Sequence, residues 1–135
     1  MEKIISTNIN ETIKTAKNYA KTLKSGDIVL LSGDLGAGKT VFSKGLVEAL
    51  TGESEVVSPT FSLCNSYNGK VPVYHFDLYR IEDISELENI GVMEMMYSGG
   101  ICIFEWAERA EGIFPSYAKK VVIKKIDEKT REISL

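Results

Sequence analysis

The chain has 135 residues, of which 44% are apolar and 26% charged, so its length and composition are those of one globular domain rather than a disordered segment. The net charge of −3 is unevenly distributed: residues 27–118 carry five basic and fourteen acidic side chains, whereas each end of the chain carries three excess positive charges. This pattern argues against a basic surface for a nucleic-acid backbone over the middle of the chain, and no apolar run approaches the roughly 20 residues of a membrane span.

The N-terminal residues and the cysteines indicate a cytoplasmic protein. Residues 1–8 lack the basic and then apolar pattern of a signal peptide. Cys64 and Cys102 lie far apart in apolar stretches, without the CxxC spacing of a metal site, so we expect free buried thiols. No repeat, low-complexity tract or linker divides the chain, and residues 1–135 are expected to form one domain without a membrane contact.

The first predicted elements are a strand at residues 3–6 and a helix after it. Apolar residues recur every three or four positions from Ile9 to Leu23, which predicts a helix with one apolar stripe facing inward. Asn8 or Asn10 can cap the start of this helix, and Gly26 suits its end.

The next segments are predicted as a buried strand, a second helix and a hairpin. Residues 27–32 form a nearly continuous apolar run, typical of a central strand covered on both faces. Apolar residues over 42–50 have helical spacing, and this helix should end at Gly52. Residues 60–67 and 71–77 are β-rich runs around Asn-Gly, so we expect an antiparallel hairpin.

The remaining segments complete a mixed sheet. Residues 82–88 predict a short exposed acidic helix, and residues 92–97 another helical turn. Residues 101–104 are a second buried-strand run. Residues 119–126 and 131–135 alternate polar and apolar residues around a polar turn, which predicts a closing hairpin. The order of elements predicts an α/β fold with a mixed β-sheet flanked by helices.

A phosphate-binding motif lies between the predicted central strand and the second helix. Residues 33–40, Gly-Asp-Leu-Gly-Ala-Gly-Lys-Thr, match G-x-x-x-x-G-K-[ST]. Gly36 and Gly38 let the backbone turn tightly, so that successive amides and the start of the helix converge on phosphate oxygens. Lys39 supplies a cation for the β- and γ-phosphates, and the Thr40 hydroxyl can bind Mg²⁺. A glycine-rich turn without a ligand is the alternative, but the complete motif in this context predicts a nucleoside triphosphate site.

The absence of guanine-specific strings favours ATP as the nucleotide. P-loop switches that bind guanine usually carry Asn-Lys-x-Asp and Asp-x-x-Gly elements. Neither string occurs in the sequence. We therefore expect ATP with Mg²⁺ as the cofactor.

Two carboxylates at strand ends are candidates for the rest of the site. Glu105 follows the buried run 101–104, which predicts a strand beside the P-loop strand, so Glu105 is the preferred metal-side acid. Asp77 ends a less cleanly patterned strand and would orient or deprotonate a water, with Thr60 nearby. A solvated carboxylate at a strand end is the alternative for each of them.

Four strings together resemble a known family. Besides residues 33–40, they are Ser-Pro-Thr-Phe at 58–61, His-Phe-Asp-Leu-Tyr-Arg at 75–80 and Glu-Trp at 105–106. Their order and spacing resemble the TsaE (YjeE-type) family, the bacterial ATPase of tRNA threonylcarbamoyladenosine biosynthesis. The resemblance runs from Ser6 to the closing hairpin, and the combination of strings is far more specific than the P-loop alone.

This resemblance implies a P-loop fold, Mg²⁺-dependent ATP hydrolysis and action within a complex. The implied partners are a threonylcarbamoyl transferase of the sugar-kinase-like fold and its inactive paralogue. The transferase modifies the adenosine next to the anticodon in tRNAs that read ANN codons. The chain would then contact tRNA only indirectly.

The resemblance also implies roles for residues at matching positions. The implied catalytic residues are Asp77, Glu105, Lys39 and Trp106, and the implied metal ligands are Thr40 and Glu105. The implied nucleotide-binding residues are Gly33, Gly36, Ala37, Gly38, Lys39, Thr40, Val41, Thr7 and Thr12. Val41 departs from the family, which commonly has a second Thr there, but its backbone amide can still bind phosphate. Thr7 and Thr12 are candidates for the adenine side, with helix capping as the alternative.

Several other residues have both a structural and a functional interpretation. His75, the only histidine, is either a hydrogen-bonded structural residue or part of the site. Trp106 is either a core anchor or a shield of the site, and Arg80 either closes a strand end or reaches a phosphate or a partner. The lysines of the closing hairpin are expected to solvate it and to protect an exposed sheet edge; they are Lys119, Lys120, Lys124 and Lys125.

The leading hypothesis is an ATPase that resets a protein complex and hydrolyses ATP slowly on its own. Only Arg80 and Arg109 lie between the P-loop and the closing hairpin, whereas P-loop kinases typically need a lid with several arginines. Residues 81–111 contain eight acids and one base, a poor wall for a second phosphorylated substrate. A small-molecule or nucleoside kinase and a nucleotide-gated binding module without appreciable turnover are the alternatives.

Overall fold

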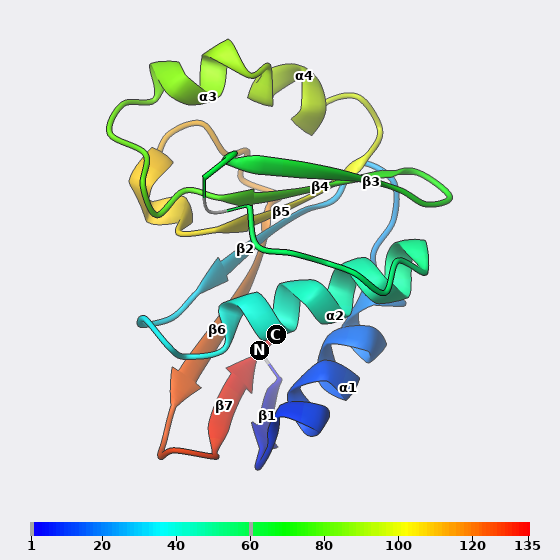
Figure 1. The fold of residues 1–135 in the computed structure, drawn as a ribbon, viewed down its shortest axis with the longest axis vertical. Helices are drawn as coiled ribbons and strands as arrows, with labels where there is room; N and C mark the ends of the chain where they lie inside the picture. Colours follow the sequence, from blue (N-terminus) through cyan, green and yellow to red (C-terminus); the bar gives the residue numbers. More distant parts are fainter. Residues whose placement is uncertain (1, 60) are drawn as a thin grey trace.

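The computed structural model describes residues 2–59 and 61–135 of an α/β fold (Figure 1). Its elements in chain order are β1 (Lys3–Ser6), α1 (Ile9–Ala20), β2 (Ile28–Ser32), α2 (Lys39–Thr51), β3 (Cys64–Asn68), β4 (Pro72–Asp77), α3 (Ser85–Asn89), α4 (Val92–Met96), β5 (Ile101–Glu105), the 3₁₀ helix η1 (Ala107–Ala110), β6 (Lys119–Lys125) and β7 (Arg131–Ser134). Strands and helices alternate as far as α2, and most of the later elements are strands, as the sequence predicts.

The described strands form one mixed sheet in the order β1-β7-β6-β2-β5-β4-β3. The P-loop strand β2 lies at its centre, between parallel neighbours β6 and β5. β4 is parallel to β5, and the antiparallel pairs β3–β4, β6–β7 and β1–β7 extend the sheet on both sides. The predicted α/β class, the hairpin after the P-loop helix and the closing hairpin are confirmed.

Helices cover both faces of the sheet. α1 and α2 lie on one face, and α3, α4 and η1 cover the other (Figure 1). Since successive side chains of a strand point to opposite faces, β2 supplies Val29 and Leu31 to the first core and Ile28 and Leu30 to the second. Burial on both faces is the reason why this strand is apolar throughout.

The inward face of α1 differs from the predicted apolar stripe. Ile9 in the first turn is 65% exposed, whereas Thr12 and Thr15 are buried. The Thr12 hydroxyl lies 2.7 Å from the Ser6 hydroxyl, and the Thr15 hydroxyl donates to the Glu11 carbonyl oxygen at 2.9 Å. Because both hydroxyls have hydrogen-bond partners, these threonines can be buried where the apolar pattern predicts only isoleucine and alanine.

Several predicted boundaries also shift by a few residues. Asn8, rather than Asn10, caps α1, and its side chain accepts a hydrogen bond from the Glu11 amide. The helix ends at Ala20, and Gly26 lies in the turn before β2 with φ of 89°. The first strand of the predicted hairpin begins at Cys64, later than expected.

The closing hairpin is not at an edge of the sheet, so the prediction that its lysines protect an exposed edge is wrong. β6 pairs with β2, and β7 pairs with β1, which leaves β1 and β3 as the edge strands. Lys119 forms an ion pair with Asp27 at 3.3 Å, and Lys124 lies opposite Glu132 on β7. The alternating sequence of β6 could not show this, because the pattern is the same whether a strand has one neighbour or two.

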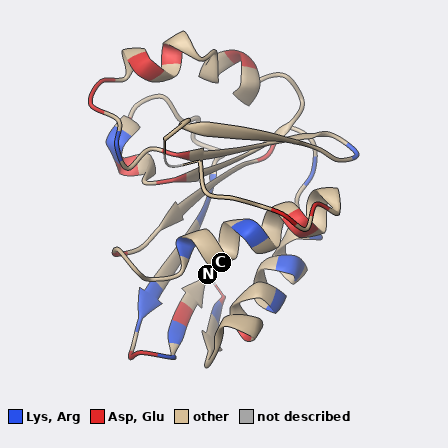
Figure 2. Ribbon diagram, in the orientation of Figure 1, with Lys and Arg blue, Asp and Glu red and all other residues tan. Residues whose placement is uncertain are grey.

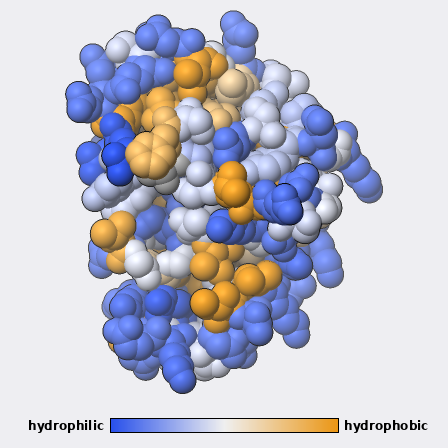
Figure 3. Space-filling model, viewed as in Figure 1, coloured by the Kyte–Doolittle hydropathy of each residue, from blue (hydrophilic) through white to orange (hydrophobic). Residues whose placement is uncertain are grey.

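Charge and hydropathy differ between regions of the surface. Asp and Glu are grouped on α3, α4 and the segments before α3 and around η1, whereas Lys predominates on α1 and β6 (Figure 2). The face shown in Figure 3 carries apolar residues in several small patches separated by hydrophilic ones. Within residues 2–59 and 61–135, no helix has the length and apolar character needed to cross a membrane.

Candidate functional site

The P-loop turn connects β2 to α2 and needs glycine for two different reasons. At Gly33 the chain runs so close to β6 that a Cβ would lie 2.4 Å from the Ile123 carbonyl oxygen. At Gly38 the backbone is left-handed, with φ of 109°, immediately before the helix. A side chain at the first position would push β6 away, and one at the second would strain the turn.

The N-terminus of α2 is open to an anion. Its cap residue, Gly38, has no side chain, and no side-chain hydrogen bond caps the helix. The first turn contains no acidic residue. The unpaired amides and the positive end of the helix dipole therefore meet the turn formed by residues 33–38, an arrangement suited to phosphate.

Lys39 is held beside this turn by main-chain oxygens and by an aromatic ring. Its Nζ donates to the carbonyl oxygens of Gly33 and Asp34, the latter at 3.0 Å. The same nitrogen lies 4.1 Å from the centre of the Trp106 ring. Burial lowers the pKa of Lys39, and nearby carboxylates, chiefly Glu105, partly offset this effect. Phosphate oxygens can accept the hydrogen bonds that Lys39 Nζ now donates to these carbonyl oxygens.

Glu105 ends β5 directly beside the P-loop strand, as the sequence predicts, and is 1% exposed. Thr40 Oγ1 donates to its Oε1 at 3.0 Å. Ser43 Oγ and His75 Nε2 contact its Oε2 at 2.9 and 2.6 Å. Burial acts to raise the pKa of Glu105, but the hydrogen bond and attraction of His75, with the hydrogen bonds of Ser43 and Thr40, hold it below its ordinary value. This buried carboxyl group is therefore ionised near neutral pH.

His75 is both a hydrogen-bonded structural residue and a direct neighbour of the site, the two interpretations that its sequence position allows. It is fully buried on β4, and its Nε2–H donates to the ionised Glu105. Its Nδ1 is buried and has no hydrogen-bond partner among the described residues. The imidazole therefore lies behind Glu105, where it orients the carboxylate without facing the cavity described below.

Asp77 ends β4 and lies in register with Glu105 on the neighbouring strand. It is 6% exposed, and its Oδ1 accepts a hydrogen bond from the Tyr79 amide at 3.0 Å. The Ser58 hydroxyl lies 3.5 Å from the other carboxylate oxygen. Thr60, expected near Asp77, lies outside the described residues.

One cavity brings the predicted phosphate, metal and catalytic residues together. It has a volume of about 450 Å³. Its lining includes Lys39, Thr40, Asp77, Glu105 and Trp106. Three different segments supply these side chains: the start of α2, the end of β4, and the end of β5 with the residue that follows it. The carboxyl ends of parallel strands meet at this edge of the sheet, which is where α/β folds commonly bind ligands.

A second cavity, of about 520 Å³, lies on the other side of the P-loop. Both cavities are lined by Gly36, Gly38 and Val41, so the loop separates them and contributes to each. The far wall of the second cavity includes Asn8 and Thr12, at the start of α1, and Arg131, at the start of β7.

The two threonines expected on the adenine side differ in position. Thr12 lines the second cavity, although it is 3% exposed and its hydroxyl contacts Ser6. Thr7 is not among the residues that line either cavity; its amide donates to a Glu11 carboxylate oxygen at 2.6 Å, in the cap of α1. Val41 lines both cavities despite its lack of a hydroxyl.

Trp106 has a strained backbone at the mouth of the site. Its φ is 61°, a left-handed conformation that is costly for a bulky residue. Its ring lies 4.8 Å from the Tyr79 ring, between centroids. The Arg109 guanidinium lies 5.2 Å from the Tyr79 ring, and that of Arg80 lies 4.6 Å from the exposed Phe61 ring. The strained turn thus directs Trp106 over Lys39.

Two residues that contact the site were not predicted from the sequence. Ser43, one helical turn after Lys39, donates to Glu105; the spacing of four residues on a predicted helix was a usable signal. Arg131, at the start of β7, donates to the carbonyl oxygens of Ala37 and Gly36 at 2.8 and 3.3 Å. No sequence signal links Arg131 to a loop more than 90 residues earlier.

The donor set at Thr40 and Glu105 fits Mg²⁺. A hydroxyl and a carboxylate oxygen lie 3.0 Å apart at the edge of the phosphate turn, and both are hard oxygen ligands. Among the described residues, no group of three or more His, Cys, Asp or Glu side chains could hold a metal. Mg²⁺ in nucleotide sites commonly takes one or two protein oxygens and completes its shell with phosphate and water, so this small set suffices.

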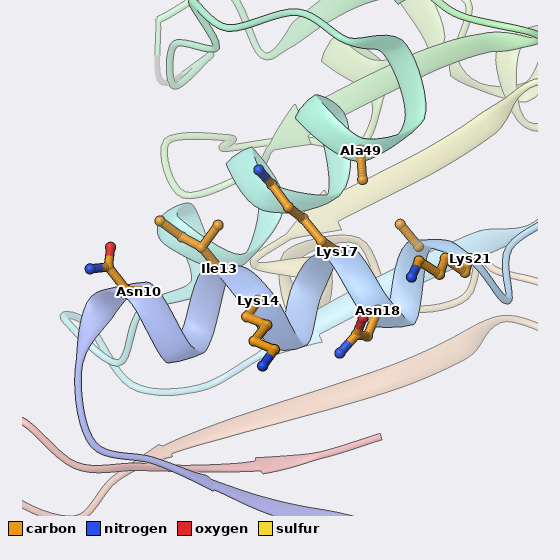
Figure 4. Close-up of a pocket in the computed structure, with 8 residues that line it drawn as sticks. Asn10, Ile13, Lys14, Lys17, Asn18, Lys21 and Ala49 are labelled. Carbon is orange, nitrogen blue, oxygen red and sulfur yellow. The ribbon is translucent and has the colours of Figure 1, made fainter.

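A third hollow, along α1, has a different character (Figure 4). It has a volume of about 580 Å³ between α1 and α2, and its charged side chains are all lysines. Lys17 reaches across toward α2, where it pairs with Glu48 at 3.5 Å. The hollow contains no carboxylate or aromatic side chain, so none of the predicted chemistry is located there.

Comparison with known proteins identifies the family. Residues 6–133 match the family described as Threonylcarbamoyl adenosine biosynthesis protein TsaE. The chain belongs to the TsaE family. Its TsaE fold agrees with that of Bacillus subtilis YdiB, whose crystal structure it matches with a TM-score of 0.83 and 38% identity, over 98% of this chain and 82% of that one.

Curated relatives support the same membership in the TsaE family. The tRNA threonylcarbamoyladenosine biosynthesis protein TsaE of Bacillus subtilis is 44% identical, over 94% of this chain and 80% of its own length. The protein of that name from Treponema pallidum is 34% identical, over 97% of each chain. The TsaE family acts in threonylcarbamoyladenosine biosynthesis in tRNA, and the resemblance of the four sequence strings to this family is confirmed.

Proposed function

We propose that this TsaE family member binds ATP with Mg²⁺ and hydrolyses it to reset a tRNA-modifying complex. The observation that carries the proposal is the single cavity in which Lys39, Thr40, Asp77 and Glu105 meet at an uncapped helix N-terminus. Neutral small molecules need no such combination of open amides, a cation and an ionised carboxylate. A bound triphosphate uses all of them.

The P-loop is the proposed phosphate site. Amides of the turn and of the first residues of α2 would bind phosphate oxygens; the residues concerned are Gly33, Gly36, Ala37, Gly38, Lys39, Thr40 and Val41. Lys39 would exchange its two carbonyl partners for β- and γ-phosphate oxygens. Its position over the Trp106 ring keeps the ammonium directed into the cavity, and Trp106 shields it from water.

Thr40 and Glu105 are the proposed metal ligands. Bound Mg²⁺ would neutralise charge on the β- and γ-phosphates. His75 and Ser43 hold Oε2 of Glu105, so the carboxylate keeps one orientation. Thr40 must turn its hydroxyl hydrogen away from Glu105 to offer a lone pair, a rotation about one bond.

Asp77 is the proposed water-positioning group. It reaches the same cavity from β4, two strands away from β2. Its side-chain oxygens can accept a hydrogen bond from a water in line with the γ-phosphate. As that water attacks phosphorus, the bond to the β-phosphate oxygen breaks, and ADP and phosphate are released.

The second cavity is the proposed nucleoside site. It adjoins the phosphate turn through Gly36, Gly38 and Val41, as the nucleoside of a bound nucleotide must. Thr12 lies in its wall, and Thr7 would act from the edge through the cap of α1. Residues 1–135 would then act as one domain, since α1, the P-loop and β7 all contribute.

The proposed partners are a threonylcarbamoyl transferase subunit and its inactive paralogue, in the cytoplasm. The product is the modified adenosine next to the anticodon of tRNAs that read ANN codons. The acidic surface over α3 and α4 suits a basic protein surface and disfavours direct contact with tRNA (Figure 2). The γ-phosphate state would bind the complex in one arrangement, and hydrolysis would release it, with a coupling of about 1–3 kcal/mol.

Phosphate release, measured with and without the partner subunits, tests the proposal. We expect slow hydrolysis by the chain alone and at least about tenfold faster hydrolysis in the complex, because a partner group completes such sites. Asp77→Ala should still bind ATP but lose turnover and tRNA modification. Equal rates with and without partners would contradict the gating, and phosphate transfer to a metabolite rather than to water would contradict the reaction.

A further inference from the structure

Arg131 joins two loops that are far apart in the sequence. It is the first residue of β7 and half-buried. Its Nε donates to the Ala37 carbonyl oxygen at 2.8 Å, and Nη2 donates to that of Gly36 at 3.3 Å. Both acceptors belong to the phosphate-binding turn. The guanidinium group therefore contacts the outer side of the P-loop.

The remaining donors of Arg131 hold the turn between β6 and β7. Nη1 donates to the carbonyl oxygens of Asp127 at 2.8 Å and Thr130 at 3.1 Å. The Asp127 carboxylate in turn accepts hydrogen bonds from the amides of Lys129 and Thr130, each at 2.9 Å. The turn is thus fixed by its own contacts, and Arg131 connects it to the P-loop.

Peptide geometry makes this contact relevant to phosphate. The peptide bond is planar and trans, so a carbonyl and the amide of the next residue point in opposite directions. With the Ala37 carbonyl directed at Arg131, the Gly38 amide must point away from Arg131. Gly38 is the left-handed cap residue of α2, where a flexible backbone could otherwise rotate this peptide.

We infer that Arg131 is a positioning residue that fixes the P-loop peptides before a nucleotide binds. The inference rests on the proposed nucleotide site. Arg131 acts through carbonyl oxygens, unlike Lys39, whose carbonyl partners are exchanged for phosphate. A planar fork can reach two loops at once, which the single ammonium group of a lysine cannot do in the same geometry. The rigid β6–β7 turn thereby keeps the amides oriented.

The test compares ligands with and without phosphate. Arg131→Met keeps an apolar stem without donors, and Arg131→Lys keeps the charge without the fork. Calorimetry measures the affinity for ADP and for adenosine, and the fluorescence of Trp106, the only tryptophan, reports on the phosphate side. We expect both variants to bind ADP about tenfold or more weakly. Because Arg131 also lines the second cavity, adenosine affinity should fall as well, but by a clearly smaller factor.

The control is Lys124→Gln, which removes a cation from the same hairpin, at an exposed position opposite Glu132. It should leave both affinities unchanged. ADP affinity within twofold of the parent in Arg131→Lys, or equal losses for ADP and adenosine, would overturn the positioning role. If the parent chain itself failed to bind ADP, the proposed function would fail instead. Arg131→Lys remains informative should Arg131→Met not fold.

Discussion

Glu105 is a buried carboxylate whose ionisation depends on its neighbours. Burying an unpaired charge costs several kcal/mol, so the carboxylate needs donors that replace water. α2 supplies two of them, Thr40 and Ser43, and β4 supplies His75. The result is an ionised oxygen ligand placed beside the P-loop hydroxyl, which is the chemical requirement of a Mg²⁺ site.

Glu105→Gln tests this assignment at the scale of one residue. The amide has nearly the same shape but no charge, so we expect hydrolysis to fall at least about 100-fold and ATP affinity to lose its dependence on Mg²⁺. Titration of ATP with Mg²⁺ or with EDTA, followed by Trp106 fluorescence, measures the second effect. Glu108→Gln, at an exposed residue of η1, is the control and should retain both properties. ATP binding that is still strengthened by Mg²⁺ would rule out Glu105 as a ligand.

The two cysteines are free and should be unreactive while the chain is folded. Burial raises the pKa of Cys64 and of Cys102 to about 12 each. The thiolate is the reactive form, and at pH 8 only about one thiol in ten thousand is ionised at such a pKa. We expect negligible alkylation by iodoacetamide at pH 8, a rate that rises with pH, and complete alkylation after unfolding in urea. Rapid alkylation of the folded chain would contradict this environment.

At the scale of elements, the P-loop depends on its packing against β6. Gly33 lets the turn pass the Ile123 carbonyl oxygen, and Arg131 connects the same turn to the β6–β7 hairpin. The closing hairpin therefore supports the nucleotide site as well as the sheet. Its position beside β2 makes this possible, since β6 is a direct neighbour of the P-loop strand.

Gly33→Ala should expose this dependence. A Cβ at 2.4 Å from the Ile123 carbonyl oxygen must displace β6 or the turn. We therefore expect the unfolding free energy to fall by about 2–3 kcal/mol and ADP binding to be lost. Gly52→Ala is the matched control: its φ is 77° and no atom lies within 4 Å of the added Cβ. Backbone strain alone should cost about 1–2 kcal/mol there and leave ADP binding intact. Urea denaturation and calorimetry measure both; equal effects at the two glycines would contradict the role of the close contact.

For the whole molecule, charge is separated between the two faces of the sheet. Acidic residues gather over α3 and α4, whereas α1 on the other face is rich in lysine (Figure 2). The phosphate site nevertheless lies within the acidic middle of the sequence. In the proposed function, amides, Lys39 and a metal ion would therefore bind the polyanion locally, and the acidic surface would remain for a protein partner.

Charge reversal on the acidic face tests that division. Glu88→Lys with Glu94→Lys changes two exposed residues of α3 and α4. We expect partner-stimulated hydrolysis to fall several-fold, and association with the partners to lose part of its salt dependence, at unchanged ATP affinity. Lys14→Glu on α1 is the control on the opposite face and should have little effect. Unchanged stimulation in the double variant would place the partner elsewhere.

Much of the fold could be predicted because its signals are local. The apolar run 27–32, the motif 33–40 and the Asn-Gly turn each specify their structure within a few residues. The prediction that Ile9 faces inward was wrong for the same reason. The spacing of apolar residues predicts a helix, but it does not show which part of that helix other elements cover. The position of β6 was missed because strand pairing is decided between distant segments.

Local patterns were enough to predict the phosphate turn, the α/β class, the family strings and the two strand-end carboxylates, since each depends on short-range geometry or on residue type. Local patterns could not show that His75 and Ser43 hold Glu105, that Trp106 covers Lys39, or that Arg131 contacts the P-loop. These contacts join residues between 30 and 95 positions apart and depend on the sheet order. Chain topology, rather than local pattern, brings such residues together.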